Sequence, residues 1–440
     1  MCYIFDIHRF IKFSQRPFFI FLSIAFVFLC YTTAVSQESN WTHFRGSKLN
    51  GVSTETKVPV SWNDSTNVMW KSDIKGKGWA SPVVFGDQVW ISTATNDGKE
   101  MWGECIDLKT GKLIYDILLF KQDSVFRKHS INSYATPTPC IEDGFVYFNY
   151  GSRGTACVNT TNGEIVWKRN DFVVEHIQGT GASLMLYKEL LIVHYEGTDF
   201  QYIIAFNKKT GEVIWRADRP QECYTGIEPI GKKSYCTPLV ININGKDLMI
   251  SNGSTVCIAY EIETGKEVWR VVEGEDSSIA MPIYEDGIVY YYTSLMTPPG
   301  NGEKFVELLA IDATGTGDVT KTNILWRHKS PILQLLTPLI KDGVIYTVDT
   351  KNTLIVFDAK TGTQTFTRRL KEKYHSSPLW AEGKVYLTSV KGETIVLKAG
   401  KIPEIISTNK VEGEVYATLA IVQNSILIRT DTSLFRIKDK

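Results

Sequence analysis

"AFNKKTGEVIW" (residues 205–215) is one copy of a phrase that the chain repeats. Each copy begins with a small residue, has Asp, Asn or Glu two positions later, continues with Thr-Gly or Asn-Gly, and ends on an aromatic residue. In-register copies end at Tyr115, Trp167, Trp215, Trp269 and Phe366. Two copies are degenerate, because residues 309–326 carry an insertion before Trp326 and residues 395–406 lack the Thr and the aromatic residue. A phrase that returns at regular intervals indicates a repeat architecture.

A second recurring element precedes each phrase. It consists of Ser/Thr-Pro, an apolar run, a tight turn and another apolar run, as in "TPLIKDGVIYTVD" (337–349). Asp-Gly and Glu-Gly between two apolar runs are typical of β-hairpins. Two copies, at 182–194 and 417–429, lack the proline. The eight hairpins begin near Ser81, Thr138, Ala182, Thr237, Met281, Thr337, Ser377 and Ala417.

The hairpin and the phrase together predict four short strands joined by tight turns. Such units recur about every 50 residues, which is typical of a β-propeller blade. We therefore predict an all-β, eight-bladed propeller of four-stranded antiparallel blades. The last copy ends with "SLFRIKDK" (433–440), which supplies only a third strand. "NVMWKSDI" (67–74) resembles the missing fourth strand, so the N-terminal strand near Trp70 is expected to close the last blade.

The segment before the propeller divides in two. Residues 1–36 read as an export signal, because basic residues precede the apolar run 17–30 and Ala34 and Ser36 suit a cleavage site before Gln37. The run is shorter than the roughly 20 residues of a typical membrane span. An uncleaved anchor and lipidation at Cys30 remain alternatives. The predicted domains are the signal (1–36), a lead-in (37–66) and the propeller (67–440).

Charge and cysteine content limit the partners. The formal net charge of the 440 residues is zero, which argues against a nucleic-acid partner. Of the eight cysteines, Cys105 and Cys157 occupy the small-residue position of the phrase and are expected to be buried. No Cys-x-x-Cys pair occurs in the sequence. The pairing of the remaining mature-chain cysteines stays open: Cys140, Cys223, Cys236 and Cys257.

The phrase, and the opening "WTHFRGSKLNGVS" (41–53), resemble those of pyrroloquinoline-quinone-type eight-bladed propellers. Trp41, Phe44, Arg45, Gly46 and Gly51 carry the second match. This family contains quinone-dependent dehydrogenases and non-catalytic scaffolds such as the propeller lipoprotein of outer-membrane protein assembly. The resemblance implies that the aromatic residues ending the phrases dock between neighbouring blades. They are Trp70, Tyr115, Trp167, Trp215, Trp269, Trp326 and Phe366.

The loops that enter the hairpins differ from blade to blade. In a propeller such loops surround the axial funnel, where a ligand or partner binds. From their chemistry we predict a funnel lining of Trp79, Arg127, His129, Asn132, Tyr134, His176, Gln178, Tyr235, Gln334, Tyr374, His375 and Tyr416. The alternative is that these segments are variable solvated loops without a binding site. The three histidines of this set belong to different blades and follow no metal-binding motif, so no metal site is predicted.

Three functions fit this sequence. The first is an exported, non-catalytic propeller of the cell envelope that binds an envelope protein or small molecule as a monomer, without cofactor or catalytic residues. It would contact the membrane only through an uncleaved or lipidated N-terminus. The second is a dehydrogenase using pyrroloquinoline quinone with calcium. The resemblance implies adjacent cysteines for that enzyme, and none are adjacent here. The third is a propeller that binds a carbohydrate through Trp79, Tyr134, Tyr235 and Tyr374.

Overall fold

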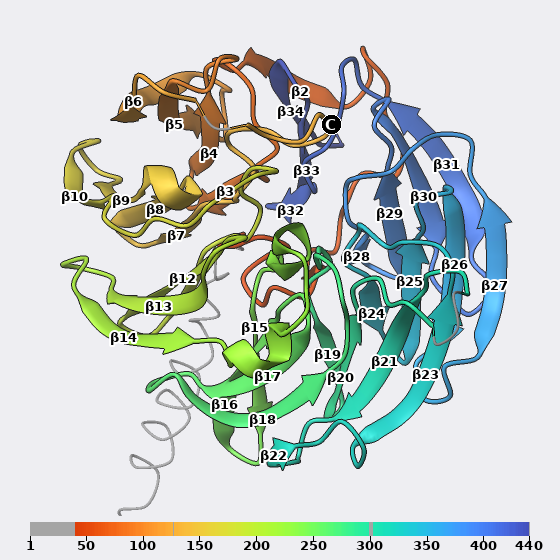
Figure 1. The fold of residues 1–440 in the computed structure, drawn as a ribbon. Coiled ribbons are helices and arrows are strands. Elements are labelled where there is room, and N and C mark those ends of the chain that lie inside the picture. Colours follow the sequence, from red (N-terminus) through yellow and green to blue (C-terminus); the bar gives the residue numbers. More distant parts are fainter. Residues whose placement is uncertain (1–39, 126, 299–301, 440) are drawn as a thin grey trace, which may run out of the picture. The chain divides into compact units, whose positions relative to one another are not determined.

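Short apolar runs separated by glycine turns form strands in the computed structural model, which describes residues 40–125, 127–298 and 302–439. The described strands form eight sheets arranged around a centre (Figure 1). The predicted eight-bladed, all-β propeller is thereby confirmed. The predicted export signal lies outside the described residues. No helix in the described parts of the chain is long and apolar enough to span a membrane.

The first four blades follow the chain order from the inner to the outer strand. Blade 1 contains β3 (Val83–Phe85), β4 (Gln88–Ala94), β5 (Glu100–Asp107) and β6 (Leu113–Lys121). Blade 2 contains β7 (Cys140–Glu142), β8 (Phe145–Asn149), β9 (Thr155–Asn159) and β10 (Ile165–Arg169). Blade 3 contains β11 (Met185–Tyr187), β12 (Leu190–Glu196), β13 (Gln201–Asn207) and β14 (Val213–Asp218). Blade 4 contains β15 (Leu239–Ile243), β16 (Lys246–Asn252), β17 (Val256–Glu261) and β18 (Lys266–Val272).

The other four blades continue around the ring. Blade 5 contains β19 (Ile283–Glu285), β20 (Ile288–Tyr292), β21 (Val306–Asp312) and β23 (Ile324–Ser330). Blade 6 contains β24 (Leu339–Lys341), β25 (Val344–Val348), β26 (Thr353–Asp358) and β27 (Gln364–Arg369). Blade 7 contains β28 (Leu379–Ala381), β29 (Lys384–Thr388), β30 (Glu393–Lys398) and β31 (Glu404–Lys410). Blade 8 contains β32 (Ala420–Val422), β33 (Ser425–Arg429), β34 (Ser433–Ile437) and β2 (Val68–Asp73). The loops contain the 3-10 helices η1 (Gly151–Arg153), η2 (Gln221–Tyr224) and η3 (Pro229–Lys232).

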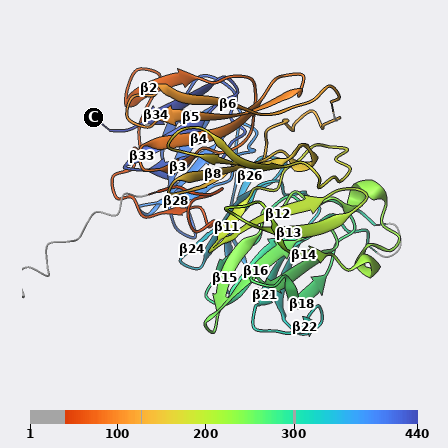
Figure 2. The same ribbon diagram turned by 90° about the vertical axis from the view of Figure 1, so that its left-hand side faces the viewer.

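Blade 8 joins the two ends of the propeller. Strand β2 pairs antiparallel with β34, with Val68 opposite Ile437. The two strands, orange and blue, lie side by side in both views (Figures 1 and 2). The predicted closure of the last blade near Trp70 is thereby confirmed. The pairing covers the outer edge of β34 and the inner edge of β2.

Two blades have a fifth strand that the repeat did not predict. Strand β1 (Val52–Ser53) runs parallel to β28 on the inner side of blade 7. Strand β22 (Gly317–Asp318) runs parallel to β18 on the outer side of blade 4. Strand β22 comes from the insertion in the degenerate phrase. The extra residues there reach back to the preceding blade and cover its outer edge.

The aromatic residues Trp70, Tyr115, Trp167, Trp215, Trp269 and Trp326 contact the phrase of the next blade. The Trp215 indole of blade 3 lies against Gly265 of blade 4, where an added Cβ would be 2.6 Å from Trp215 Cε3. Trp215 Nε1–H donates to the carbonyl oxygen of Ile262 at 3.2 Å. Equivalent indole–carbonyl hydrogen bonds are made by Trp70, Trp167, Trp269 and Trp326. The glycine of the phrase therefore allows the turn, and because it has no side chain, the aromatic ring of the preceding blade can pack directly against it.

The small residue of the phrase lies opposite the aromatic residue. Ala205 on β13 pairs with Trp215 on β14, at a register shift of the ladder. Cys105 and Cys157 occupy the same position opposite Tyr115 and Trp167. Both thiols are fully buried and unpaired, as are Cys140, Cys236 and Cys257, while the unpaired Cys223 is half-buried. The position opposite the ring takes a small or β-branched residue, since Val356 occupies it opposite Phe366.

The Ser/Thr residues that begin the hairpins link neighbouring blades around the axis. The Ser377 amide donates to Thr418 Oγ1 at 3.0 Å, and corresponding amide–hydroxyl bonds join most other neighbours. Met281 has no hydroxyl and interrupts the series. We call the hydroxyl residues around the axis the hydroxyl tier: Thr138, Ser183, Thr237, Thr337, Ser377 and Thr418.

Replacing Thr418 with the near-isosteric valine is expected to lower the free energy of unfolding by about 1–3 kcal/mol, because the buried Ser377 amide loses its acceptor. Ser81→Ala is the matched control, since Ser81 Oγ has no hydrogen-bond partner among the described residues. That substitution should change stability by less than about 1 kcal/mol. Guanidinium unfolding curves measure both values. Equal losses would mean that the amide–hydroxyl bond contributes nothing.

The lead-in crosses one end of the propeller. Residues 40–55 make hydrogen bonds with the innermost segments of several blades. Their partners are Val84, Ile141, Leu186, Thr337, Trp380 and Ile421, which belong to blades 1, 2, 3, 6, 7 and 8. This segment therefore ties together blades that are distant around the ring.

Arg45 anchors the lead-in. Its guanidinium is fully buried and donates to the carbonyl oxygens of Thr337 at 3.1 Å and Pro338 at 2.9 Å. Burial lowers the pKa of Arg45 to about 9. An added Cβ on Gly51, whose φ is +76°, would lie 2.6 Å from Arg45 Nη2. The arginine and glycine of the "WTHFRGSKLNG" motif are therefore packed against each other.

Candidate functional site

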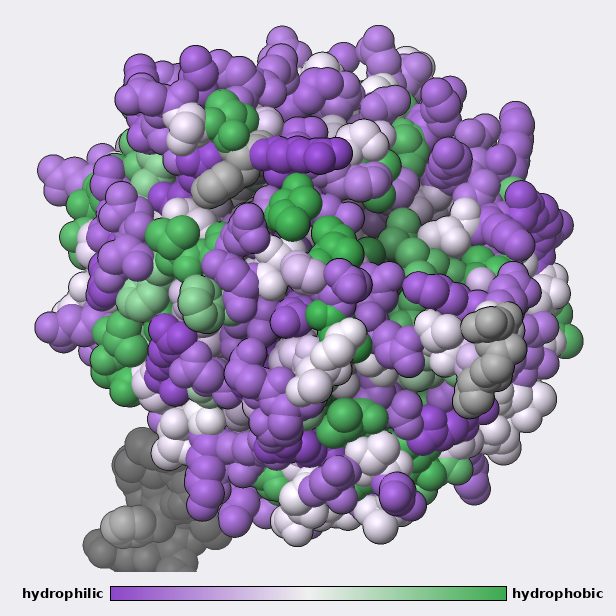
Figure 3. Space-filling model, in the orientation of Figure 1, coloured by the Kyte–Doolittle hydropathy of each residue, from purple (hydrophilic) through white to green (hydrophobic). Residues whose placement is uncertain are grey.

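A cavity of about 440 Å³ opens among the loops that precede the innermost strands. All eight blades contribute to its lining, which places it on the propeller axis. Figure 3 shows the propeller in the orientation of Figure 1, with hydrophobic groups among hydrophilic ones near the middle of this face. The cavity is the candidate functional site.

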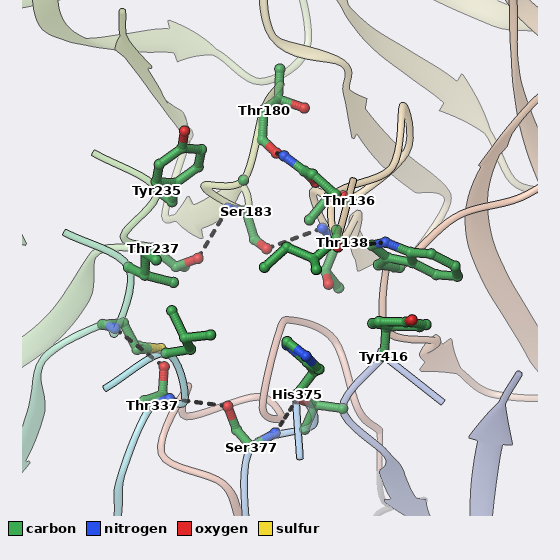
Figure 4. Close-up of a pocket in the computed structure, with 18 of the residues that line it drawn as sticks. Thr136, Thr138, Thr180, Ser183, Tyr235, Thr237, Thr337, His375, Ser377 and Tyr416 are labelled. Carbon is green, nitrogen blue, oxygen red and sulfur yellow. Dashed lines mark hydrogen bonds between the residues drawn. The ribbon is translucent and has the colours of Figure 1, made fainter. Parts of the chain in front are cut away.

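The hydroxyl tier forms one layer of the lining. Figure 4 labels five of its members around the cavity, Thr138, Ser183, Thr237, Thr337 and Ser377, with dashed lines joining Ser183 to Thr237 and Thr337 to Ser377. Each oxygen of the tier accepts a backbone N–H from the preceding blade. None of these hydroxyls donates its own hydrogen to another group among the described residues.

A second layer lies two residues earlier in every blade. Side chains at i and i+2 of an extended chain point to the same side, so these positions also face the axis. We call them the loop-side tier: Trp79, Thr136, Gly181, Tyr235, Ile279, Leu335, His375 and Tyr416. The chemistry of this tier, unlike that of the hydroxyl tier, differs from blade to blade.

Aromatic residues occupy one arc of the loop-side tier. The rings of Trp79 and Tyr416 stack with centroids 4.1 Å apart, and His375 lies 5.4 Å from Tyr416. Burial, together with Lys373, lowers the pKa of His375, which favours its neutral form. Figure 4 shows Tyr235 across the cavity from Tyr416.

Aliphatic residues and the lead-in complete the wall. Ile279 and Leu335 of the loop-side tier join Leu333 and Met281 in blades 5 and 6. Phe44 of the lead-in also lines the cavity, between the anchored His43 and Arg45. The innermost strands run from the loops toward the lead-in, whose Trp41 pairs with Val84. Phe44 therefore lies at the end of the cavity opposite the loops.

The loops at the mouth are held by amide groups. Asn132 Nδ2 donates to the carbonyl oxygens of Gln178 and Thr180 at 2.9 and 3.0 Å. The Tyr235 hydroxyl donates to Gln178 Oε1 at 2.7 Å. These hydrogen bonds hold the loops of blades 2, 3 and 4 together at the mouth of the cavity.

Seven of the twelve predicted funnel residues line the cavity: Trp79, His129, Asn132, Gln178, Tyr235, His375 and Tyr416. The other five do not. Arg127 is on an exposed part of its loop, and Tyr134 lies against Gly98 of blade 1. Gln334 and Tyr374 are buried three residues before the hydroxyl tier, an odd spacing that turns both side chains away from the axis.

His176 is buried against a lysine rather than in the cavity. Its Nδ1 lies 2.5 Å from Lys233 Nζ, which also donates to the Glu196 carbonyl oxygen at 3.0 Å. Burial lowers the pKa of Lys233 to about 7. Burial and the neighbouring lysine lower the pKa of His176 well below its ordinary value. Neither residue lines the candidate site.

Sequence reasoning missed Thr136, Gly181, Ile279 and Leu335, because they have unremarkable side chains. It also missed Phe44, because the lead-in was not expected to reach the axis. Counting back two residues from Ser/Thr-Pro would have found Thr136 and Leu335, but not Gly181 or Ile279, whose hairpins do not begin with Ser/Thr-Pro. No comparable signal locates Phe44, whose position depends on bonds to distant blades.

The ring of phrases and the axial cavity define the chain as a quinoprotein-like β-propeller. A family model described as outer membrane protein assembly factor BamB matches residues 80–217, 199–320 and 316–401. These matches extend over most of the described propeller, and the chain belongs to this family. The resemblance identified from the phrase is thereby confirmed.

Individual relatives are distant. The europium-containing methanol dehydrogenase superposes with a TM-score of 0.67 at 10% identity, covering 90% of each chain. BamB from Moraxella catarrhalis superposes with a TM-score of 0.57 at 12% identity, covering 84% of this chain and 99% of that chain. A tetrathionate hydrolase from Acidithiobacillus ferrooxidans is 22% identical over 277 residues, 58% of this chain and 50% of the relative. The chain thus spans half the length of that relative, and the solved structures show the fold alone.

Proposed function

We propose that this chain is a non-catalytic binding propeller of the cell envelope. The observation that carries the proposal is the chemistry of the axial cavity. Its described lining consists of hydroxyl, amide, aromatic and aliphatic side chains, with His129 and His375 as its imidazoles. General acid–base catalysis most often uses a histidine that a second group such as a carboxylate orients, and metal-assisted catalysis needs a cluster of metal ligands. No carboxylate is among the described lining residues that accompany the two imidazoles. This lining offers groups that hold a ligand and few that would transform one.

The same lining bears on the quinone dehydrogenase alternative. Pyrroloquinoline quinone is a polycarboxylate, and calcium prefers carboxylate and carbonyl oxygen ligands. Among the described residues, no three His, Cys, Asp or Glu side chains gather into a metal-binding group. Within the part of the chain that the structure describes, the lining also has no Lys or Arg to face the carboxylates of the quinone. These residues do not fit the cofactor, which supports a role without it.

The partner that we propose is a protein of the cell envelope. Support comes from the family, whose model is described as an outer membrane assembly factor. A propeller presents many loops on a rigid ring, which suits a scaffold.

Reconstitution tests the non-catalytic role. The full chain, incubated with pyrroloquinoline quinone and calcium, is expected to retain no quinone absorbance after gel filtration. It should also reduce no dye when alcohols or sugars are added. A quinoprotein alcohol dehydrogenase treated in parallel is the positive control. Stoichiometric retention of the quinone with substrate-dependent dye reduction would overturn the proposal.

A further inference from the structure

We infer that the axial cavity binds an uncharged guest whose polar atoms are hydrogen-bond acceptors, that is, a carbonyl compound with an apolar body. The inference deepens the binding role proposed above by naming the class of ligand. It rests on three properties of the cavity: the direction of its hydrogen-bonding groups, its neutrality and its apolar wall.

The described lining has several hydrogen-bond donors without a partner, while each oxygen of the hydroxyl tier already accepts one hydrogen bond and keeps a single further lone pair. A hydroxyl has one hydrogen to donate and two lone pairs. In the hydroxyl tier one lone pair accepts an inter-blade N–H, and the hydrogen has no acceptor among the described residues. Gln178 Oε1 accepts from Tyr235, while Gln178 Nε2 makes no hydrogen bond within the described chain. A guest with carbonyl oxygens would satisfy these donors.

Neutrality excludes a charged guest. No Asp, Glu, Lys or Arg is among the described lining residues, so an ion entering the cavity would find no counter-charge. Transfer of an unpaired carboxylate from water into such a site is strongly unfavourable. The pKa of His375 is lowered, so this imidazole does not supply a positive charge at neutral pH.

The wall favours an apolar body over a sugar. Ile279, Leu335 and Phe44 present hydrocarbon to the cavity. One face of Trp79 and one face of Tyr416 are stacked on each other, and His375 lies 5.4 Å from Tyr416, so this cluster offers a sugar ring less free aromatic face than separate rings would. A polyol would also bring several O–H donors, for which each oxygen of the hydroxyl tier has a single lone pair left.

A set of four small probes tests the ligand class on the full chain. Acetophenone carries a carbonyl on an apolar ring, benzyl alcohol replaces it with a hydroxyl, benzoate with a carboxylate, and methyl glucoside represents a sugar. Titrations followed by ligand-observed NMR should show acetophenone binding about tenfold more tightly than benzoate or methyl glucoside, because only acetophenone avoids burying a charge or unpaired donors. Benzyl alcohol should bind more weakly than acetophenone and more tightly than benzoate or methyl glucoside. Preference for methyl glucoside or benzoate, or no binding of acetophenone, would overturn the inference.

Substitutions in the loop-side tier test whether acetophenone binds in the axial cavity. Leu335→Asp places a carboxylate in the loop-side tier and should weaken acetophenone binding at least about tenfold. Leu325→Asp is the matched control, because Leu325 is 54% exposed on β23 and should leave binding unchanged. If Leu335→Asp does not fold, His375→Asp serves instead, since the half-buried His375 makes no hydrogen bond in the described chain. Unchanged binding in a folded variant of this tier would overturn the inference. The quinone reconstitution reports catalysis and the probes report occupancy, so the two proposals can fail separately.

Discussion

Replacement of Trp215 by alanine is expected to lower the free energy of unfolding by about 3–5 kcal/mol, the usual range for a buried tryptophan. The indole is 8% exposed, packs on Gly265 of the next blade and donates a hydrogen bond to Ile262. Alanine removes this inter-blade contact and leaves a cavity. Guanidinium unfolding followed by tryptophan fluorescence or circular dichroism measures the loss.

Ile214→Ala is the control for this prediction. Ile214 precedes Trp215 on the same strand but is 52% exposed, so its truncation should change stability by about 0.5 kcal/mol or less. A loss below about 1 kcal/mol for Trp215→Ala, or an equal loss for both variants, would contradict a docking role for the aromatic residue of the phrase.

Gly265→Ala is expected to destabilise the protein by about 3 kcal/mol through two effects, left-handed backbone strain and overpacking. The φ of Gly265 is +70°, and an added Cβ would lie 2.6 Å from the Trp215 ring. Gly287→Ala separates the two effects, because Gly287 has φ +85° with open space around the added Cβ. It should lose only about 1–2 kcal/mol.

A double-mutant cycle decides whether the ring causes the additional loss. With Trp215 already replaced by alanine, the added Cβ at Gly265 no longer meets the indole. The loss caused by Gly265→Ala should then fall to that of Gly287→Ala, so the two substitutions in contact should be non-additive. Strict additivity would show that the strain at Gly265 arises from the backbone alone.

Local patterns predicted the blades. The alternation of apolar runs and Gly turns depends only on residues that are neighbours in the sequence, so the sequence alone predicts eight four-stranded units. The match between residues 67–74 and the end of the phrase also predicted the partner of the last strand. Strands β1 and β22 were not predicted, because each has only two residues and matches no strand of the repeat.

The candidate site was predicted less completely. Choosing loop residues by chemistry found Trp79, His375 and Tyr416, whose side chains face the axis. The same criterion selected Gln334 and Tyr374, whose odd spacing from the hydroxyl tier turns them into the core. It overlooked Leu335 and Ile279, which have ordinary side chains and the correct spacing.

The sequence by itself determined the repeat, the small-residue and aromatic positions of each phrase and the number of blades, because each depends on a spacing that recurs along the chain. Only the tertiary structure decided how the units connect. The indoles of Trp70, Trp167, Trp215 and Trp326 pack against a glycine of the next blade, and each hydroxyl of the hydroxyl tier accepts an amide N–H from the preceding blade. It also placed Phe44 in the axial cavity, since the path of the lead-in is set by bonds to blades hundreds of residues away. Such contacts form only when the ring closes, and a pattern of neighbouring residues does not contain them.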